Sequence, residues 1–138
     1  MMIELAIQKA IYKRLTTTQE VLSLVPFKNI LDRNQQPKVD PLILLGSDQI
    51  VDDSSNIKRC NWRIYSTVDI WKTETGLTGT KAISGAIRQA IRNGKPELDT
   101  GYHCVDWYVA TTRFLRDPDG EHSHGILTIE SLIVEEQP

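Results

Sequence analysis

The chain has 138 residues, of which 40% are hydrophobic and 25% charged, and its formal net charge is −2 at pH 7. This is the size of one ordinary domain, and no apolar run approaches the roughly 20 residues that cross a membrane. The formal charge of −2 argues against a protein that binds nucleic acid by neutralising its phosphates, which takes a basic surface. We therefore expect one domain over residues 1–138 with no membrane partner. The amino terminus lacks a secretion signal, which favours folding in a cytoplasm.

The amino-terminal segment has the apolar period of a helix. Its hydrophobic positions recur every three or four residues and form one stripe, comprising Ile3, Ala6, Ile7, Ala10, Ile11 and Leu15. We expect this helix to end in the threonines at 16–18, because β-branched side chains lose rotamer freedom in a helix. A short second helix from Gln19 to Leu24 should follow and stop before Pro26.

Three segments in the middle of the chain follow the pattern of strands. A short strand is expected at residues 30–33, with a polar loop at 34–38. Residues 41–51 form a second strand whose start is apolar on both faces, which is typical of a central position in a sheet. Residues 52–56 are polar and predict a mobile loop. Residues 60–72 alternate strictly, which indicates a half-exposed antiparallel strand.

A second long helix and a hairpin complete the chain. The helix should begin at residues 78–80, where Gly79 and its flanking threonines are expected to cap it, and end at Asn93 and Gly94. Its stripe consists of Ile83, Ala86, Ile87, Ala90 and Ile91. Residues 102–116 and 125–135 form two strands joined by a turn, in which Pro118 fixes φ and Gly120 accepts a positive φ.

The order helix, strands, helix, hairpin predicts an α+β fold rather than a doubly wound sheet. We expect a mostly antiparallel sheet of four or five strands. The two main helices should pack on one face, and a long β-hairpin should stand at the carboxyl end.

Tests for catalytic and metal chemistry give weak signals. Asp69 and Lys72 resemble part of a metal-dependent nuclease site, but their spacing of three places them on opposite faces of a strand. The glycines at 76 and 79 do not have Walker-loop spacing. Asp117, Asp119, His122 and His124 crowd one turn and could hold a divalent metal, although they do not follow the calcium-loop pattern. We predict no cofactor and no enzymatic activity.

The cysteines and tryptophans also suggest packing. His103 and Cys104 are adjacent in a strand and point to opposite faces, so the imidazole is badly placed to activate the thiol. Two buried, reduced thiols are expected at Cys60 and Cys104. The three tryptophans, Trp62, Trp71 and Trp107, lie in apolar strands and favour core or subunit packing over stacking on nucleobases.

Taken together, these segments resemble the tail-completion, or tail-terminator, proteins of long-tailed bacteriophages, prophages and gene transfer agents. The resemblance is carried by the first helix at residues 5–15, the Pro-x-x-x-x-Gly stretch at 41–46 and the strand end at 68–71. It continues through the Ala/Ile-rich helix at 81–92 and is most specific at residues 115–120 and at His124-Gly125. It departs at residues 30–34, where many relatives carry an Ile-Tyr or Val-Tyr pair.

The resemblance implies a structural protein of the virion neck, assembled in the host bacterial cytoplasm. Such proteins form a ring, commonly of six copies, that ends the tail tube and presents a surface for the head. The implied partners are other copies of the chain, the tail tube protein and the head-completion or stopper protein. Duplex DNA would pass through the lumen without tight binding, because a ring of six chains with a charge of −2 per chain carries −12 in total. A sibling head-closure role and a phage nuclease are the alternatives.

Two polar regions are the candidate contact sites. One is the hairpin turn, with Arg116, Asp117, Asp119 and His122, and the other is the loop that includes Asp52 and Asp53. The alternative for the first is a local ion pair between Arg116 and Asp117 that only shapes the turn.

Overall fold

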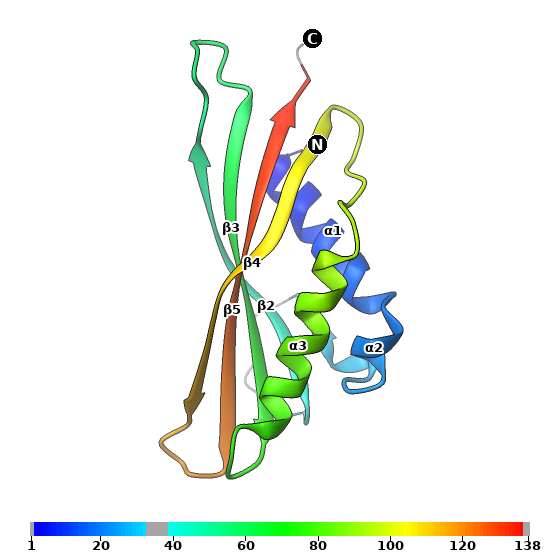
Figure 1. Cartoon of the computed structure of the whole chain (residues 1–138), viewed down its shortest axis with the longest axis vertical. Coiled ribbons are helices and arrows are strands. Elements are labelled where there is room, and N and C mark those ends of the chain that lie inside the picture. Colours follow the sequence, from blue (N-terminus) through cyan, green and yellow to red (C-terminus); the bar gives the residue numbers. More distant parts are fainter. Residues whose placement is uncertain (1, 33–38, 137–138) are drawn as a thin grey trace.

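The computed structural model describes residues 2–32 and 39–136. These residues form three α-helices and a short 3-10 helix, and the α-helices lie on one side of a long-stranded sheet (Figure 1). Helices α1 (Ile3–Thr16), α2 (Gln19–Leu22) and the short 3-10 helix η1 (Phe27–Asn29) precede all the strands, and α3 (Thr78–Arg92) follows the third strand. The strands are β1 (Ile30–Leu31), β2 (Leu42–Asp52), β3 (Asn61–Thr73), β4 (Tyr102–Arg116) and β5 (His122–Glu135). The predicted α+β class is confirmed.

The sheet has the order β1-β2-β3-β5-β4 and is mixed. All pairs are antiparallel except β1 and β2, which run parallel with Ile30 opposite Ile43. The predicted strand at 30–33 is present as Ile30 and Leu31, whereas Arg33 and the predicted loop at 34–38 lie outside the described residues. The prediction that the apolar stretch at 41–46 is central in the sheet holds only at the start of β2. Beyond Leu44, β1 no longer pairs with it, and residues 46–49 are exposed.

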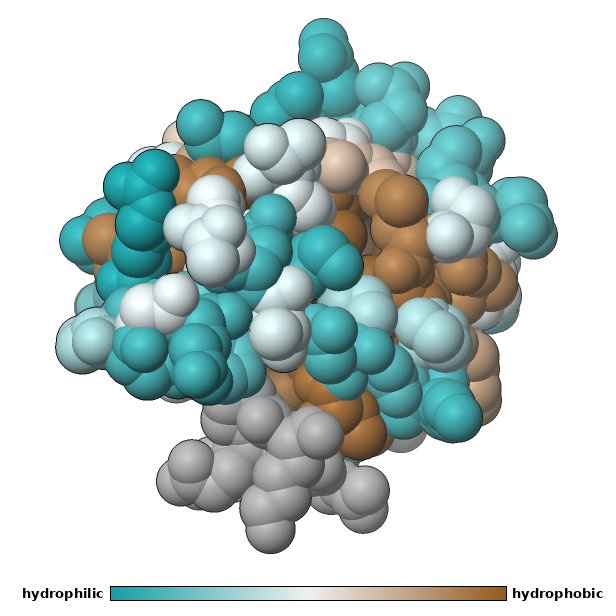
Figure 2. All heavy atoms as spheres, turned by 90° about the horizontal axis from the view of Figure 1, so that it is seen from below, coloured by the Kyte–Doolittle hydropathy of each residue, from teal (hydrophilic) through white to brown (hydrophobic). Residues whose placement is uncertain are grey.

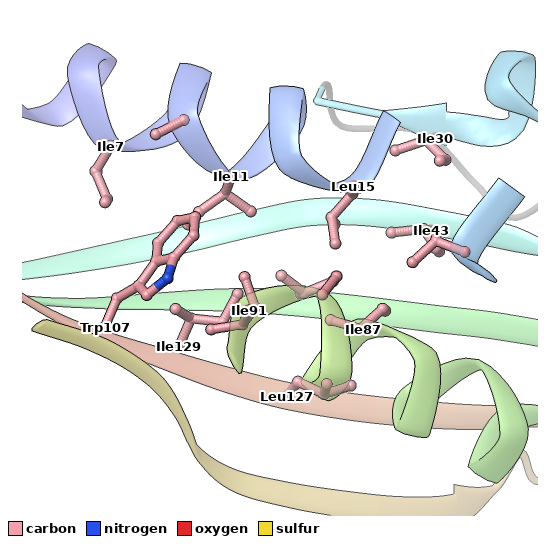
Figure 3. Close-up of a cluster of buried hydrophobic side chains, with 14 of the residues drawn as sticks. Ile7, Ile11, Leu15, Ile30, Ile43, Ile87, Ile91, Trp107, Leu127 and Ile129 are labelled. Atoms are coloured by element: carbon pink, nitrogen blue, oxygen red, sulfur yellow. The ribbon is translucent and has the colours of Figure 1, made fainter. Parts of the chain in front are cut away.

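The core lies between the sheet and the helices (Figure 3). The predicted stripes are confirmed: Ile7, Ile11 and Leu15 of α1 and Ile87 and Ile91 of α3 are almost completely buried. They pack against the alternating residues of β3 and β5 that face the helices, namely Ile64, Val68, Ile70, Leu127, Ile129 and Ile133. Each such side chain contributes about 1.5–3 kcal/mol when buried, so the stripes hold the helices on one face.

Three residues join α1, α3 and β4 at one point. The guanidinium of Arg14 donates to the carbonyl oxygens of Ala90, at 2.7 Å, and Gly94, at 3.0 Å. It also lies 4.9 Å from the ring centroid of the buried Trp107, whose indole Nε1 donates to Gly94 O at 3.0 Å. The end of α3 is therefore capped by side chains from two other elements, while Gly94 leaves the helix with φ +92°.

The ends of the helices differ in detail from their predicted form. The three threonines do end α1, and their hydroxyls donate to carbonyl oxygens of its last turns: Thr16 to Tyr12, Thr17 to Lys13 and Thr18 to Arg14. Helix α2 ends at Leu22, two residues earlier than predicted. The prediction that Gly79 and its threonines cap α3 is wrong, because the carboxylate of Glu74 accepts from the amides of Gly79 and Thr80 at 2.8 and 2.9 Å.

The opposite face of the sheet is the open face, over which no described helix lies (Figure 1). It carries the residues that alternate with the core positions, including Arg63, Asp69 and Trp71 of β3 and His124 and Glu130 of β5. The β2–β3 and β4–β5 hairpins project at opposite ends of this face. None of the described helices has the length and apolar character to cross a membrane.

Candidate assembly interface

The turn between β4 and β5 is built as its sequence predicts. The amide of Gly120 donates to Asp117 O at 3.0 Å, and Gly120 has φ +74°. Strand β5 begins at His122, three residues earlier than expected, because the amide of Asp117 pairs with His122 O at 2.9 Å. Residues 116–122, called here the hairpin tip, lie at a mainly hydrophilic end of the molecule where some hydrophobic residues show between polar ones (Figure 2).

Asp119 organises the hairpin tip. Its Oδ1 accepts from the backbone amides of Glu121 and His122, at 2.8 and 3.1 Å, and its Oδ2 lies 2.6 Å from His122 Nδ1. The amide of Glu121 and the imidazole together lower the pKa of Asp119 to about 2, and the carboxylate raises the pKa of His122. Two of the predicted contact residues are therefore held in place within the tip.

Arg116 stands apart from this network, whereas Asp117 lies beside Asp119 and His122. Arg116 is exposed, and within the described residues it forms no ion pair with Asp117. The local-pair alternative for these two residues therefore has no support in the structure. Whether Arg116 contacts a partner stays a prediction.

The suspected metal cluster at the turn separates into two groups. Ligand atoms of Asp117, Asp119 and His122 lie within 4.8 Å of one another, an arrangement that the hydrogen bonds of Asp119 and the backbone bond from Asp117 N to His122 O already explain. His124 does not join them. Its Nε2 lies 2.8 Å from Asp69 Oδ1 on β3, and its ring stacks on Trp71 with centroids 3.8 Å apart.

The β2–β3 loop uses its two acidic residues internally. Asp52 Oδ2 lies 3.2 Å from the guanidinium of Arg59, and its Oδ1 accepts from the amide of Ser54. Asp53 Oδ2 lies 3.1 Å from Arg63 Nη2. Sequence reasoning missed Ile57, whose exposed fraction of 92% makes it the most exposed of the large hydrophobic residues described. An isolated isoleucine in a polar loop is the signal that could have found it.

A network of charges crosses the middle of the open face. The guanidinium of Arg63 pairs with Glu130 as well as with Asp53, and Tyr108 Oη donates to Glu130 Oε2 at 2.6 Å. The hydrogen bonds from Tyr108 and Arg63 lower the pKa of Glu130. Arg63 is paired with two carboxylates, so this network leaves no unpaired cation to attract a polyanion.

The structure places the suspected catalytic pairs apart. Lys72 packs on the helix side of the sheet, so close to Gly79 that a Cβ added at this glycine would lie 2.3 Å from Lys72 Cδ. Asp69 is on the open face with His124. Cys60 and Cys104, both described, form no disulfide, but each is half-buried, so the prediction of full burial was wrong. Burial raises the pKa of the Cys104 thiol to about 11, which makes it a poor nucleophile. His103 lies 2.6 Å from Glu136 instead.

The tryptophans divide between the core and the open face. Trp107 is buried beneath Arg14, and Trp71 is half-buried against His124. Trp62 is half-buried at the edge of the core, where its indole Nε1 has no partner among the described residues. Packing therefore accounts for Trp107, as predicted.

Comparison with known proteins gives a family and two structural neighbours. A family model described as "Tail completion protein gp17" matches residues 9–133. No curated protein matches the chain. A chain in the virion of a native gene transfer agent particle has a TM-score of 0.83 at 17% identity, covering 96% of this chain and 97% of that chain. The gp17 protein of bacteriophage SPP1 has a TM-score of 0.58 at 19% identity, covering 91% and 87%.

The family match spans most of the chain, and the chain belongs to the family of tail completion proteins. At these identities the two solved structures show a shared fold only. The family assigns the chain a structural role in tail completion as a component of the virion. The expectation based on the hairpin and the helices is confirmed at this level.

Proposed function

We propose that this tail completion protein is the tail terminator: a ring of six copies that caps the head-proximal end of the tail tube. The ring stops tube growth and provides the surface to which the filled head attaches. Its neighbours are the tail tube protein and the head-completion protein, and the chain acts as one domain over residues 1–138 without catalysis. The match to the tail completion family over residues 9–133 carries the proposal.

Three structural features support a role in assembly. The open face has no helix over it in the described chain, and the two hairpins project from opposite ends of the sheet. Arg116 and Ile57 expose a cation and an apolar side chain at these hairpins. A closed ring needs two complementary surfaces on each copy, and a stable contact buries at least ~1,000 Å².

The charge pairing on the open face also suits a conduit. Arg63, Glu130 and Asp69 each have a partner within the chain. A wall with no unpaired cation displaces few counterions from passing duplex, so it does not hold the DNA.

Electron micrographs of particles made without this protein test the proposal. A terminator is required to stop polymerisation, so its loss should give overlong tails without heads, and expression of the intact chain should restore normal length. Headless tails of normal length would contradict tail termination and assign a head-closure role instead.

A further inference from the structure

A groove runs along α1 beside the segment that links α3 to β4. It consists of two adjoining hollows of about 240 and 470 Å³, which share Ala10, Lys13 and Glu97 in their walls. We call it the α1 groove. One wall is α1, from its buried Ala6 and Ala10 to its exposed Lys13, and the other is the 95–99 segment.

The α1 groove has an excess of available positive charge. Lys13 and Lys95 are both exposed, and neither forms an ion pair with another described residue. Lys9 is already paired with Asp99 at 3.6 Å, and Arg14 is engaged at the end of α3. Of the acidic side chains that line the groove, only Glu97 lacks an ion pair within the described residues.

The neighbouring helix surface has the same sign. Helix α3 contains Lys81, Arg88 and Arg92, all exposed, and no acidic residue. The helix layer is therefore basic although the whole chain carries −2. The compensating acidic residues lie on the strands and in the loops.

The hairpin tip has the complementary charge. It holds Asp117, Asp119 and Glu121 against the single cation Arg116 and the imidazole of His122. The hydrogen bonds of Asp119 fix its shape, so little ordering is needed when it docks. The tip and the segment after α3 lie at opposite ends of the molecule (Figure 1), so they cannot meet within one chain.

We propose that the acidic hairpin tip of one copy docks in the α1 groove of the next copy. Lys13 and Lys95 then face Glu121 and Asp117. The contact joins two different surfaces, so a pair of copies still has one free tip and one free groove, and further copies can be added until the ring closes. This inference rests on the proposed ring and names the surfaces that form it.

Cysteine cross-linking in assembled tails tests the contact. Lys13→Cys and Glu121→Cys are made as separate single variants, in a background with Cys60→Ala and Cys104→Ala, and are expressed together with the tail genes. Mild oxidation of purified tails should give covalent dimers that need both variants. Lys28→Cys with Glu121→Cys is the matched control, because Lys28 is exposed on η1 outside the groove.

The double variant, with both cysteines on one chain, extends the test. It should give a ladder of covalent multimers that ends at the closed ring. If micrographs show rings on the same tails but no cross-links form at these positions, the proposed contact is wrong and the proposed function still stands. Equal cross-linking in the Lys28→Cys control, or dimers from either variant alone, would also overturn it.

Charge reversal gives a second readout. Lys13→Glu should lower the fraction of capped tails by about 2- to 5-fold for each weakened contact, and Glu121→Lys in the same chain should restore it. Failure of the second change to restore assembly, with both variants folded, would contradict the pairing.

Discussion

In the β4–β5 turn, Nδ1 of His122 lies 2.6 Å from Oδ2 of Asp119, whose other oxygen accepts two backbone amides. The aspartate thus links the imidazole to the backbone of the hairpin tip. The pKa of His122 is raised by this carboxylate, and the pKa of Asp119 is lowered to about 2. The stabilisation that this pair gives to the turn should therefore be lost both in acid, where Asp119 is protonated, and at higher pH, where His122 loses its proton.

The direction in which pH changes the stability of the turn follows from the direction of each pKa shift. The raised pKa of His122 means that its pairing stabilises the turn fully below the ordinary histidine value of about 6.5. That stabilisation is lost as pH rises through the raised value. The lowered pKa of Asp119 gives stabilisation that is present above about 3.9 and is lost as pH falls toward about 2.

Replacing the carboxylate should return the imidazole to its ordinary titration. We expect Asp119→Asn to lower the pKa of His122, measured by an NMR pH titration of the imidazole signals. Asp117→Asn is the control and should have a smaller effect, because Asp117 acts on His122 only through its charge. An unchanged His122 pKa in Asp119→Asn would show that the pair is absent in solution.

Removal of Arg14 should destabilise the fold. Arg14→Ala deletes two hydrogen bonds to the end of α3 and the contact with Trp107, and we expect a loss of about 1–3 kcal/mol. Urea denaturation monitored by circular dichroism measures it. Lys13→Ala, one residue earlier and exposed, should change stability by less than about 0.5 kcal/mol. Equal effects of the two changes would refute the role given to Arg14.

Glu74 should act as the cap of α3. Its carboxylate accepts from two amides of the first turn and from the hydroxyl of Ser123 at 2.7 Å. Although burial acts to raise its pKa, these hydrogen bonds lower it overall. We expect Glu74→Ala to cost about 1–2 kcal/mol near neutral pH, measured by thermal unfolding.

The same experiment has a pH control. The lowered pKa of Glu74 means that its contribution is present above the ordinary value and is lost as pH falls. The difference between the wild-type chain and Glu74→Ala should therefore shrink in acid. A difference that stays constant down to pH 3 would argue against a role for the ionised carboxylate.

Charge reversal at Arg116 should separate folding from assembly. The side chain is exposed and unpaired among the described residues, so Arg116→Glu should leave the unfolding free energy within about 0.5 kcal/mol. The fraction of tails with heads attached should fall, as counted in micrographs. Normal assembly would remove Arg116 from the contact surface.

The ring should bind duplex DNA weakly even at low salt. The chain carries −2, and the charges of Arg63 and Asp69 on the open face are paired internally. A filter-binding assay with the isolated protein at low ionic strength measures this. Tight retention of duplex would contradict the prediction.

Local sequence patterns predicted much of this fold, because the spacing of hydrophobic residues along the chain shows directly which face of a helix or strand is buried. The stripe of Ile7, Ile11 and Leu15 and the alternation around Ile64 needed no knowledge of distant residues. The turn at Pro118 and Gly120 was predicted for the same reason. Strand β4 alternates less clearly, because its register relative to β5 shifts at 105 and 110.

The remaining features depend on residues far apart in the chain. The cap of α3 by Arg14 joins positions 76 and 80 residues apart, and the pair of His124 with Asp69 spans 55. Asp52 and Asp53 looked available in the sequence, but Arg59 and Arg63 pair with them once the β2–β3 hairpin forms. Whether these two aspartates also contact a partner stays a prediction.

The position of the protein in assembled tails tests the central claim most directly. We predict that a label fused to the chain, imaged by electron microscopy of purified tails, marks a closed ring at the end that faces the head. A label at the opposite end, along the tube, or on single unclosed copies would contradict the assignment.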